Sequence, residues 1–515
     1  MARLHEYQGK ELLKRFKLAV PRGGVARTPE EARQIAEEIG GEAMVKMQAW
    51  VTGRAGLGGI KKASNPAQAE EAARHMLGQR IKNFTVEQVL VEERVEIARE
   101  FYAGVIIDDA AQQPIILFSS VGGTGIEEIA AAHPDKVARM HVDVGTGLLD
   151  FQARDLVRRT GIGGKLQVDL GNVLVSLYNL AQQYDARAAE INPLVQLSDG
   201  TLMAADCRVT VDDYGIFRHK DLGIEIAREY DRPPTELEKI AYKVEANDYR
   251  GTFYFIQMAE GFEKGEGYVG FHGAGGGGSM MSMDAIMRQG YKMATFVDTS
   301  GNPAASKVYR AARIVMAAGP IDGYFGSGSG VASQEQFHSA RGFVKAFLET
   351  QIDVPVVIRL GGNSEDKAVE ILEWLNGWVP APVEGYKKDN PPDHCAARLH
   401  ALIQEGKRVE PQKRERPGAA GEARLYQFET VTGGTVTYDH AVCATCETKA
   451  CIQECVPKIL TCNEEGLPVL NITAEEARKG RCIECLACEV DCFFRGAGGG
   501  HIVLPIPGLD EYLAA

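Results

Sequence analysis

Cysteines are the residues of this chain best suited to chemistry, and most of them lie near its end. Nine of the eleven follow residue 440. Eight of these form two runs, Cys-x2-Cys-x4-Cys-x3-Cys from Cys443 and Cys-x2-Cys-x2-Cys-x3-Cys from Cys482. Three closely spaced thiolates can bind one face of a four-iron cluster, and a fourth cysteine one helical turn further along can reach a second cluster. The two runs therefore predict a pair of [4Fe–4S] clusters that carry single electrons.

The spacing of the two runs resembles that of bacterial ferredoxins with two clusters. The first run departs from that pattern, because four residues instead of two separate Cys446 from Cys451. Phe493 also stands where the pattern has proline. The resemblance implies that each run donates its last cysteine to the cluster of the other run. One cluster would then be bound by Cys443, Cys446, Cys451 and Cys492, and the other by Cys482, Cys485, Cys488 and Cys455.

Two other uses of these cysteines fit the sequence less well. Zinc takes four ligands and would leave several thiols without a role. Disulfides form in oxidising compartments, and the charged, amphipathic start of the chain lacks the apolar stretch of a signal peptide. We therefore expect a cytoplasmic protein with reduced thiols. The isolated Cys207, Cys395 and Cys462 are expected to be small, buried, apolar residues.

The composition limits the classes of protein to which the chain can belong. Its 515 residues suffice for three or four domains. The net charge of −13 argues against a nucleic-acid partner, and no run of 18 apolar residues exists that could span a membrane. A hydrophobic content of 45% together with 57 glycines is typical of an α/β protein with many tight turns.

Alternating helix and strand signals indicate how the chain positions its functional residues. Thr28-Pro29 and Asn65-Pro66 predict helix starts, because Thr and Asn cap helices and proline fits the first turn. From about residue 263 the pattern becomes strand, glycine-rich loop and helix, repeated. The unbroken apolar run 354–360 is typical of a buried parallel strand. The polar segment 411–423, which contains proline and glycine, is typical of a linker.

Glycine-rich loops precede three of the predicted helices, which begin after Gly278, Gly330 and Gly362. Backbone N–H groups at the start of a helix form an anion-binding site. Parallel sheets bind their ligands at the carboxyl ends of the strands, where these loops lie. We therefore expect carboxylate or phosphate groups to bind there.

Several short motifs together resemble the β subunit of succinyl-CoA synthetase. They are Leu4-His-Glu-Tyr-Gln-Gly-Lys10, Gly53-Arg54, Glu190-Ile-Asn-Pro193 and the glycine-rich loops. The resemblance covers about residues 1–385 and extends to the ATP-binding part of ATP citrate lyase and citryl-CoA synthetase. It implies an α/β fold with an ATP-grasp domain at 1–235 and a flavodoxin-like CoA-ligase domain at 236–410. After the linker 411–423, a small α+β ferredoxin-like domain would occupy 424–515.

The resemblance implies which residues bind the nucleotide. Lys46 would contact a phosphate of ATP as a compact point charge. Gly53 and Arg54 would lie in the lid loop over the phosphates. Glu92 would lie near the adenine and ribose, and Glu100 would make a second nucleotide contact. Each of these charged residues could instead be an ordinary solvated side chain.

The resemblance also implies a metal site and a catalytic acid. Asn192 and Asp206 match the Mg²⁺ ligands, and their hard oxygen atoms suit that ion. Glu190 matches the acid that steadies a phosphohistidine during phosphoryl transfer.

In the second domain, Arg359 ends a buried strand and would clamp a carboxylate with two parallel hydrogen bonds, or would form a structural salt bridge. His272 stands where succinyl-CoA synthetases carry asparagine, and it would either contact the substrate or pack in the core. The loop residues expected to border the acid and phosphate sites are Gly276, Gly277, Ser329, Gly330, Val331 and Ala332.

The family reaction passes a phosphoryl group from ATP to a histidine and then to a carboxylic acid, whose acyl phosphate is attacked by CoA. The phosphohistidine and the main CoA-binding domain belong to an α-type subunit, so the resemblance implies a hetero-oligomer with that partner. We expect the β-type subunit of an NDP-forming acid–CoA ligase, linked by its clusters to a redox enzyme or a ferredoxin. The alternatives are clusters that gate ligation, clusters that only staple the fold, and an ATP-driven electron-transfer subunit that has lost ligation.

Overall fold

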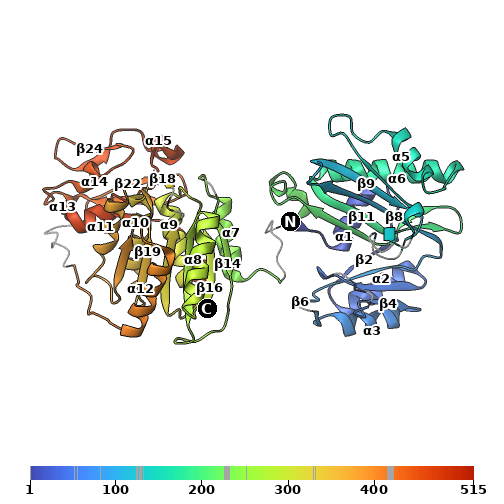
Figure 1. Cartoon of the computed structure of the whole chain (residues 1–515), viewed down its shortest axis with the longest axis horizontal. Helices are drawn as coiled ribbons and strands as arrows, with labels where there is room; N and C mark the ends of the chain where they lie inside the picture. Colours follow the sequence, from blue (N-terminus) through green and yellow to red (C-terminus); the bar gives the residue numbers. More distant parts are fainter. Residues whose placement is uncertain are drawn as a thin grey trace. The chain divides into compact units, whose positions relative to one another are not determined.

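The computed structural model describes residues 2–515 except 52, 55, 82, 123–125, 127–129, 132, 225–231, 251, 329, 331 and 415–422. The chain forms two compact units, Met1–Pro233 and Pro234–Ala515, and each is described by itself (Figure 1). Two of the predicted site residues, Ser329 and Val331, lie outside the described residues.

The first unit contains a four-stranded antiparallel sheet in the order β2-β7-β3-β4. Helices α2 (Pro29–Ile39) and α3 (Pro66–Met76) pack on it through alanine-rich faces. The predicted helix starts are confirmed, because Thr28 and Asn65 each accept a hydrogen bond from the N–H three residues further on. The strands are β2 (Gly23–Ala26), β3 (Ala43–Met47), β4 (Ile60–Ala63) and β7 (Val89–Glu93), with the hairpin β5 (Arg80–Ile81) and β6 (Phe84–Thr85) nearby in the chain.

A larger antiparallel sheet in the order β1-β13-β11-β8-β9-β10 completes the first unit, with β12 paired to β11. The register of β11 with β13 places Ile191 opposite Cys207, so that Asn192 and Asp206 lie side by side at the end of this pair. The strands are β1 (Ala2–Arg3), β8 (Ile97–Asp108), β9 (Gln113–Ser119), β10 (Val137–His141), β11 (Ala186–Leu197), β12 (Leu202–Ala204) and β13 (Cys207–Val211). The helices are α1 (Glu6–Arg15), α5 (Asp150–Arg158) and α6 (Gly164–Gln183).

The second unit is built on a six-stranded sheet in the order β14-β16-β15-β17-β19-β21, parallel except for β14. The expected strand–loop–helix repeat and the buried strand within 354–360 are confirmed. Its strands are β14 (Tyr254–Gln257), β15 (Tyr268–Ala274), β16 (Lys292–Asp298), β17 (Gly323–Gly328), β19 (Val356–Arg359) and β21 (Val383–Tyr386), and a two-stranded sheet adds β18 (Ala332–Glu335) and β20 (Gly362–Asn363).

Helices cover both faces of this sheet and create two apolar cores. Helices α7 (Glu236–Ala246), α9 (Ala305–Met316), α10 (Phe337–Thr350) and α11 (Glu365–Glu373) contribute to one core. Helices α8 (Gly276–Arg288) and α12 (Pro392–Glu405) contribute to the other. We call residues 234–414 the flavodoxin-like segment.

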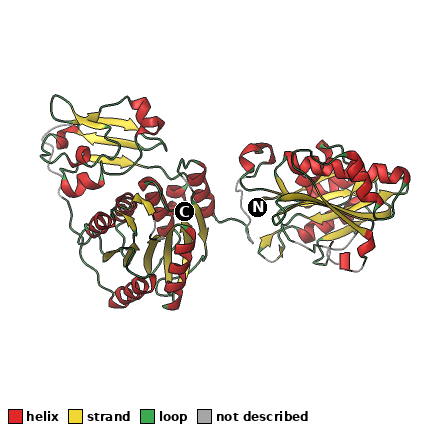
Figure 2. Cartoon of the chain, turned by 45° about the horizontal axis from the view of Figure 1, so that its top comes forward, coloured by secondary structure: helices red, strands yellow, loops and turns green. Residues whose placement is uncertain are grey.

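The remaining residues 423–515, which we call the cysteine-rich segment, form a small α+β structure with short helices around a three-stranded sheet (Figure 2). Its strands are β22 (Leu425–Glu429), β23 (Thr435–Asp439), β24 (Leu460–Cys462), β25 (Pro468–Leu470) and β26 (Gly500–Val503). Its helices are α13 (His440–Cys443), α14 (Ala450–Gln453), α15 (Ala474–Glu476), α16 (Val490–Arg495) and α17 (Leu509–Ala514).

The predicted linker 411–423 is described only in part. Its start is held in place, because Gln412 donates its N–H to the Gly377 carbonyl at 2.7 Å and the Arg414 side chain donates to the Gly496 carbonyl at 2.6 Å. Among the described helices, none is long and apolar enough to cross a membrane.

Candidate functional site

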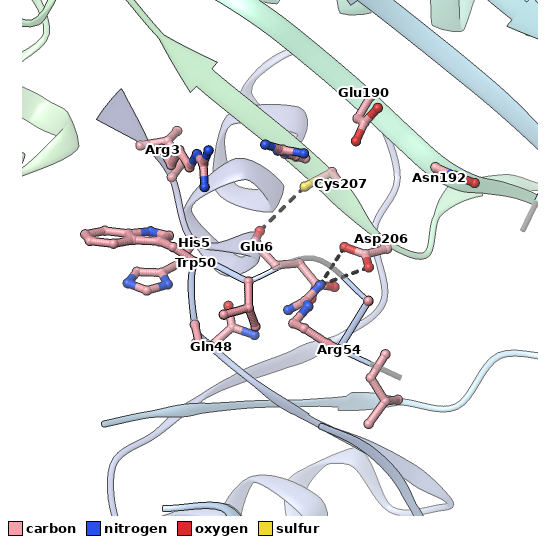
Figure 3. Close-up of a pocket in the computed structure, with 16 residues that line it drawn as sticks. Arg3, His5, Glu6, Gln48, Trp50, Arg54, Glu190, Asn192, Asp206 and Cys207 are labelled. Carbon is pink, nitrogen blue, oxygen red and sulfur yellow. Dashed lines mark hydrogen bonds and ion pairs between the residues drawn. The ribbon is translucent and has the colours of Figure 1, made fainter. Parts of the chain in front are cut away.

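A cavity of about 460 Å³ in the first unit collects residues from both of its sheets (Figure 3). The turn into α1, the segment after β3 and the facing strands β11 and β13 all contribute side chains. The lining residues are Arg3, Leu4, His5, Glu6, Gln48, Ala49, Trp50, Val51, Gly53, Arg54, Ile60, Glu190, Asn192, Asp206, Cys207 and Arg208.

Glu6 is the centre of a buried charge network at this cavity. Its carboxylate lies 2.8 Å from the Lys10 ammonium, 2.9 Å from the Lys46 ammonium and 2.8 Å from the Arg54 guanidinium. Glu92 pairs with the same two lysines, each at 2.5 Å. Buried charges persist only when they are paired in this way.

Asp206 completes the network, which then holds three cations and three anions. Its carboxylate receives hydrogen bonds from the Arg54 guanidinium at 2.9 and 3.1 Å, which Figure 3 shows as dashed lines. The lysines Lys10 and Lys46 both donate to the carbonyl oxygen of Ala205, at 2.9 and 2.7 Å. The network therefore fixes the backbone next to Asp206 as well as its side chain.

The pKa shifts follow from this crowding of charge. Burial disfavours ionisation of Glu6, but Lys46, Lys10 and Arg54 outweigh it and hold the pKa of this carboxyl well below its usual range. Burial, followed by the charge of Glu6, raises the pKa of Asp206 to about 6. Burial lowers the Lys46 pKa, but Glu6 and Glu92 more than reverse this and raise it. An additional cation at this site would therefore favour the ionised form of Asp206.

The predicted metal ligands lie together on the wall of the cavity. Asn192 donates its backbone N–H to the Asp206 carbonyl at 3.1 Å, and both residues line the cavity. Glu190 lies two residues before Asn192 on β11 and accepts a hydrogen bond from the Tyr102 hydroxyl at 3.0 Å. Amide and carboxylate oxygens are the ligands that Mg²⁺ prefers, so the donor set fits that ion.

The predicted nucleotide residues do not all lie at the cavity. Gly53 and Arg54 line it, and Gly53 has a left-handed backbone (φ 71°). Lys46 and Glu92 are buried and paired within the charge network. Glu100 lies on β8 opposite Val195 and is not among the lining residues.

Sequence reasoning missed Glu6 and Lys10, although both lie within the quoted motif. They are one helical turn apart on α1, a spacing that also describes exposed surface pairs. Only their burial, at 5% and 3% exposure, distinguishes them from such pairs. His5 and Trp50 were also missed, and their stacked rings, 5.0 Å apart, line the same cavity.

In the second unit, the glycine-rich loops lie where the parallel strands end. Gly276 and Gly277 form the first turn of α8, and Ala332 begins β18 just after Gly330. Arg359, at the end of β19, donates to the carbonyl oxygens of Gly328, Lys388 and Asn390 at 2.7–2.8 Å. Three of its five N–H groups therefore hold the loops, and its contact with a carboxylate substrate stays a prediction.

His272 packs in the core beneath these loops. Its ring nitrogens lie 2.8 Å from the Tyr324 hydroxyl and 3.3 Å from the Thr299 hydroxyl, and its ring contacts the edge of Phe343. Burial lowers its pKa to about 3, so the ring is neutral at physiological pH.

The thiols of the cysteine-rich segment have neighbours from their own predicted sets. The Cys451 pKa is raised to about 12 by burial and then by Cys492, Cys443 and Cys446. The Cys488 pKa is raised by burial and then by Cys485, Cys482 and Cys455. These last four cysteines line one small cavity, together with Cys451 of the other set.

Backbone and side-chain groups around these thiols suit sulfur ligands. The Gly500 N–H points to the Cys492 sulfur at 3.4 Å. The Tyr438 hydroxyl is buried and has no hydrogen-bond partner among the described residues. Burial raises its pKa, and nearby thiols of both sets raise it further. No three His, Cys, Asp or Glu side chains converge on one metal ion in the part of the chain that the structure describes. A four-iron cluster takes one thiolate per iron, so its ligands surround a volume and need not converge on a point.

The three isolated cysteines differ in their burial. Cys207 and Cys395 are buried, as expected. The expectation for Cys462 is wrong, because it is exposed. It pairs with Pro468 next to the turn that joins β24 to β25, in a sheet of only these two strands.

Comparison with known proteins gives consistent results. Residues 3–196 match the model of the ATP-grasp domain. The β subunit of a GDP-forming succinate–CoA ligase from Thermus thermophilus is 39% identical over 386 residues, which cover 75% of this chain and 97% of the relative. The ADP-forming counterpart from Rubrobacter xylanophilus is 38% identical over 373 residues, or 72% and 92% of the two chains.

A solved structure extends the likeness to the fold. ATP citrate lyase from Methanothrix soehngenii, in complex with citrate and coenzyme A, superposes with a TM-score of 0.64 over 78% of this chain and 99% of that chain. The sequences are 18% identical, so this match shows the fold alone. The expected α/β fold with an ATP-grasp domain and the expected NDP-forming CoA ligase subunit are confirmed. At 39% identity over nearly the whole of the Thermus relative, this chain belongs to the family of succinate–CoA ligase β subunits.

Proposed function

We propose that the chain binds ATP with Mg²⁺ in the 460 Å³ cavity and passes the γ-phosphoryl group to a histidine of an α-type partner. The observation that carries this proposal is the convergence of Asn192 and Asp206 with Arg54 on one cavity wall. Two oxygen ligands would leave room for phosphate oxygens and water around the ion. The bound ion would neutralise charge on the transferring group.

The remaining cavity residues have roles that follow from their positions. Arg54 holds Asp206 in the free chain, and nucleotide phosphates would compete for its guanidinium, which pairs well with phosphate. Release of Arg54 would leave the Asp206 carboxylate available to the metal. Glu190, fixed by the Tyr102 hydroxyl, would accept a hydrogen bond from the partner's histidine and orient its ring.

The acid would bind in the second unit, at the loops that end its parallel strands. The start of α8 at Gly276 presents backbone N–H groups to an anion. Arg359 holds Gly328 together with Lys388 and Asn390, and these residues would form the opposite wall. CoA would be held mainly by the α-type partner, so that a hetero-oligomer makes the acyl-CoA.

We also propose that the cysteine-rich segment binds two [4Fe–4S] clusters and passes electrons to or from a redox enzyme or ferredoxin. The neighbours of each thiol, the N–H aimed at Cys492 and the buried Tyr438 hydroxyl support this assignment. The same thiols need a reducing compartment such as the cytoplasm.

Ligation is tested with the complex of this chain and an α-type subunit. Nucleoside diphosphate release is measured with and without CoA across a panel of mono-, di- and tricarboxylates. We expect release to require both CoA and one class of acid. Release that needs no acid would favour the ATP-driven electron-transfer alternative instead.

Two variants test the metal site within that assay. Asp206→Asn is expected to slow release at least about 100-fold, because it removes a ligand charge from the metal. Asp199→Asn, at an exposed turn, is the matched control and should keep the rate. Equal rates in the two variants would exclude Asp206 as a metal ligand.

Cluster binding is tested by iron and acid-labile sulfide analysis of anaerobically purified protein. We expect about eight irons per chain, as two four-iron clusters require. Cys485→Ser should lose iron, whereas Cys462→Ser, at the exposed cysteine outside both sets, should retain it. Protein without iron or sulfide would refute the cluster assignment.

A further inference from the structure

The cysteine-rich segment is not a tethered module, because it packs on the helices of the flavodoxin-like segment. Four of its carboxylates lie directly beside a cysteine of the two runs, and each faces a cation from a helix of the flavodoxin-like segment. The four carboxylates belong to Glu454, Glu484, Glu489 and Asp491, next to Cys455, Cys485, Cys488 and Cys492.

Helix α10 supplies the two most deeply buried of these cations. The Arg341 guanidinium lies 2.7 Å from the Asp491 carboxylate, and both side chains are fully buried. The Lys345 ammonium, one turn further along α10, lies 2.7 Å from Glu489 and is also fully buried. These two residues place positive charge on the face of α10 that the cysteine-rich segment covers.

Neighbouring helices add further pairs around this contact. Lys367 on α11 lies 2.6 Å from Glu454. Arg310 on α9 lies 3.8 Å from Glu484 and donates to the Thr432 hydroxyl at 2.7 Å. The contact is therefore made by three consecutive helices of the unit.

Aromatic residues next to the last cysteine complete the contact. The Phe494 ring lies 5.3 Å from the Trp374 ring, and the Phe493 ring lies 5.1 Å from the Trp378 ring. Phe493 is the residue that replaces the proline of the ferredoxin pattern. The departure from that pattern thus has a structural use, because it supplies an apolar anchor at this contact.

Helix α10 joins this contact to the predicted acid and phosphate loops. It begins at Phe337, two residues after β18, and the Gln336 N–H bonds to the Asn363 carbonyl at 2.8 Å. The Gln334 backbone N–H donates to the side-chain oxygen of Asn302 at 3.0 Å. Loops that follow β16, β17 and β19 therefore meet at the start of α10, the helix that Arg341 and Lys345 fix from the other side.

The physical cost of losing the contact is large. A buried ion pair that loses one partner leaves an uncompensated charge in the interior, and such a loss strongly destabilises a folded domain. The cysteine-rich segment is itself small, with described helices of three to six residues. Many small metal-binding domains fold only when their metal is bound.

We propose that Arg341 and Lys345 are positioning residues through which the cluster-loaded cysteine-rich segment fixes α10 and the loops around the acid site. This inference rests on the proposed clusters and ligase site. Loss of the clusters unfolds the part of the cysteine-rich segment that packs on α10. The loops at the start of α10 then become mobile, and acyl-CoA formation stops. The ligase is thereby active only in protein that holds its clusters.

The test compares the full chain, in complex with its α-type partner, before and after iron is removed with ferricyanide and EDTA. Hydrogen–deuterium exchange of α10 and residues 332–336 is the main readout. We expect exchange there to accelerate at least tenfold when iron is lost, together with loss of acyl-CoA formation. Exchange in α2 and α3 of the first unit should not change, since that unit holds none of these contacts.

A pair of variants separates the contact from the metal. Lys345→Met should accelerate exchange in α10 and slow ligation while iron remains bound, because Glu489 loses its cation. Arg288→Met, which breaks an exposed pair with Asp393 in the same unit, is the matched control and should change neither.

Each remaining outcome has a distinct meaning. Unchanged exchange and ligation after complete removal of iron would overturn the inference and leave the proposed clusters and ligation intact. Protein that never binds iron would overturn the cluster assignment and the inference with it. Iron analysis of the starting material distinguishes these two failures.

Discussion

At the scale of single residues, Glu6 decides how much positive charge the first-unit cavity can hold. Its carboxylate faces three cations within 3 Å, and its side chain is almost completely buried. Arg54 pairs with both Glu6 and Asp206, so the proposed lid arginine is shared between Glu6 and the proposed metal ligand. If the cavity binds ATP as proposed, Glu6 and Lys10 would shape the site through Arg54 and Lys46.

Glu6→Gln is expected to destabilise the first unit by about 3–5 kcal/mol, because three buried cations would keep only Glu92 and Asp206. The free energy of unfolding is measured by chemical denaturation, with hydrogen exchange in α1 as the probe of unfolding. Glu11→Gln is the control, since its pair with Lys14 is exposed and worth less than about 1 kcal/mol. Equal stability of the two variants would contradict a central role for Glu6.

Arg54→Ala is expected to weaken ATP binding by roughly 10- to 100-fold, because it removes charge-assisted hydrogen bonds to phosphate. Isothermal titration with ATP and Mg²⁺ measures the change. Arg33→Ala, on the exposed face of α2, removes a surface pair with Glu37 and should leave the affinity as it is. An unchanged affinity in Arg54→Ala would assign this arginine to structure alone.

At the scale of elements, parallel strands β15, β17 and β19 bring the glycine-rich loops to one edge of the second sheet. His272 lies in β15 just below that edge and contacts Phe343 of α10. A buried neutral imidazole favours folding only while it stays unprotonated. The fold around β15 is therefore expected to lose stability as the pH falls below about 6.5, the ordinary pKa of histidine.

His272→Asn tests this dependence. The folded pKa of about 3 lies below the usual 6.5, so the stabilisation is complete above pH 6.5 and is lost progressively as pH falls toward 3. Between pH 8 and 5.5, wild-type stability should fall relative to the variant by about 1.4 kcal/mol. Hydrogen exchange in β15 at several pH values measures the difference.

The matched control for this experiment is His394→Asn, which removes an exposed imidazole from α12 in the same unit. A packing defect caused by His272→Asn would change the difference in stability between wild type and variant by the same amount at every pH. Only a difference that grows as pH falls supports the buried neutral ring, and a constant difference would contradict it.

At the scale of the whole molecule, the chain combines a ligase subunit with a cysteine-rich segment. Helices of the flavodoxin-like segment hold the cysteine-rich segment in place. The relatives that define the family match 72–75% of the chain. The motifs quoted from the sequence do not include the phosphohistidine loop, which the family resemblance assigns to an α-type partner. We therefore expect the isolated chain to bind nucleotide and to make no acyl-CoA.

This last prediction is checked by assaying the purified chain alone and after addition of an α-type subunit. ATP binding by the chain alone should match that of the complex within a few fold, whereas acyl-CoA should form only in the complex. Acyl-CoA formation by the chain alone would show that the catalytic histidine lies within it.

The sequence by itself predicted the local structure and the chemistry of spaced residues. Helix caps at Thr28 and Asn65 depend on the neighbouring residues alone, and the structure confirms both. The alternation of strands, glycine loops and helices likewise predicted a parallel sheet, since each unit of that pattern is local. The cysteine spacing predicts clusters on a similarly local basis, because a cluster needs ligands within a few turns of chain, and that assignment stays a prediction.

Only the tertiary structure decided which charges are buried and with what they pair. Glu6 and Lys10 have the spacing of a surface pair, and the folding of distant β3 and β7 against α1 places Lys46 and Glu92 beside them. In the same way, Arg341 and Asp491 are 150 residues apart in the chain and meet only in the folded unit. Contacts over such separations depend on the packing of whole elements, which no local pattern of residues records.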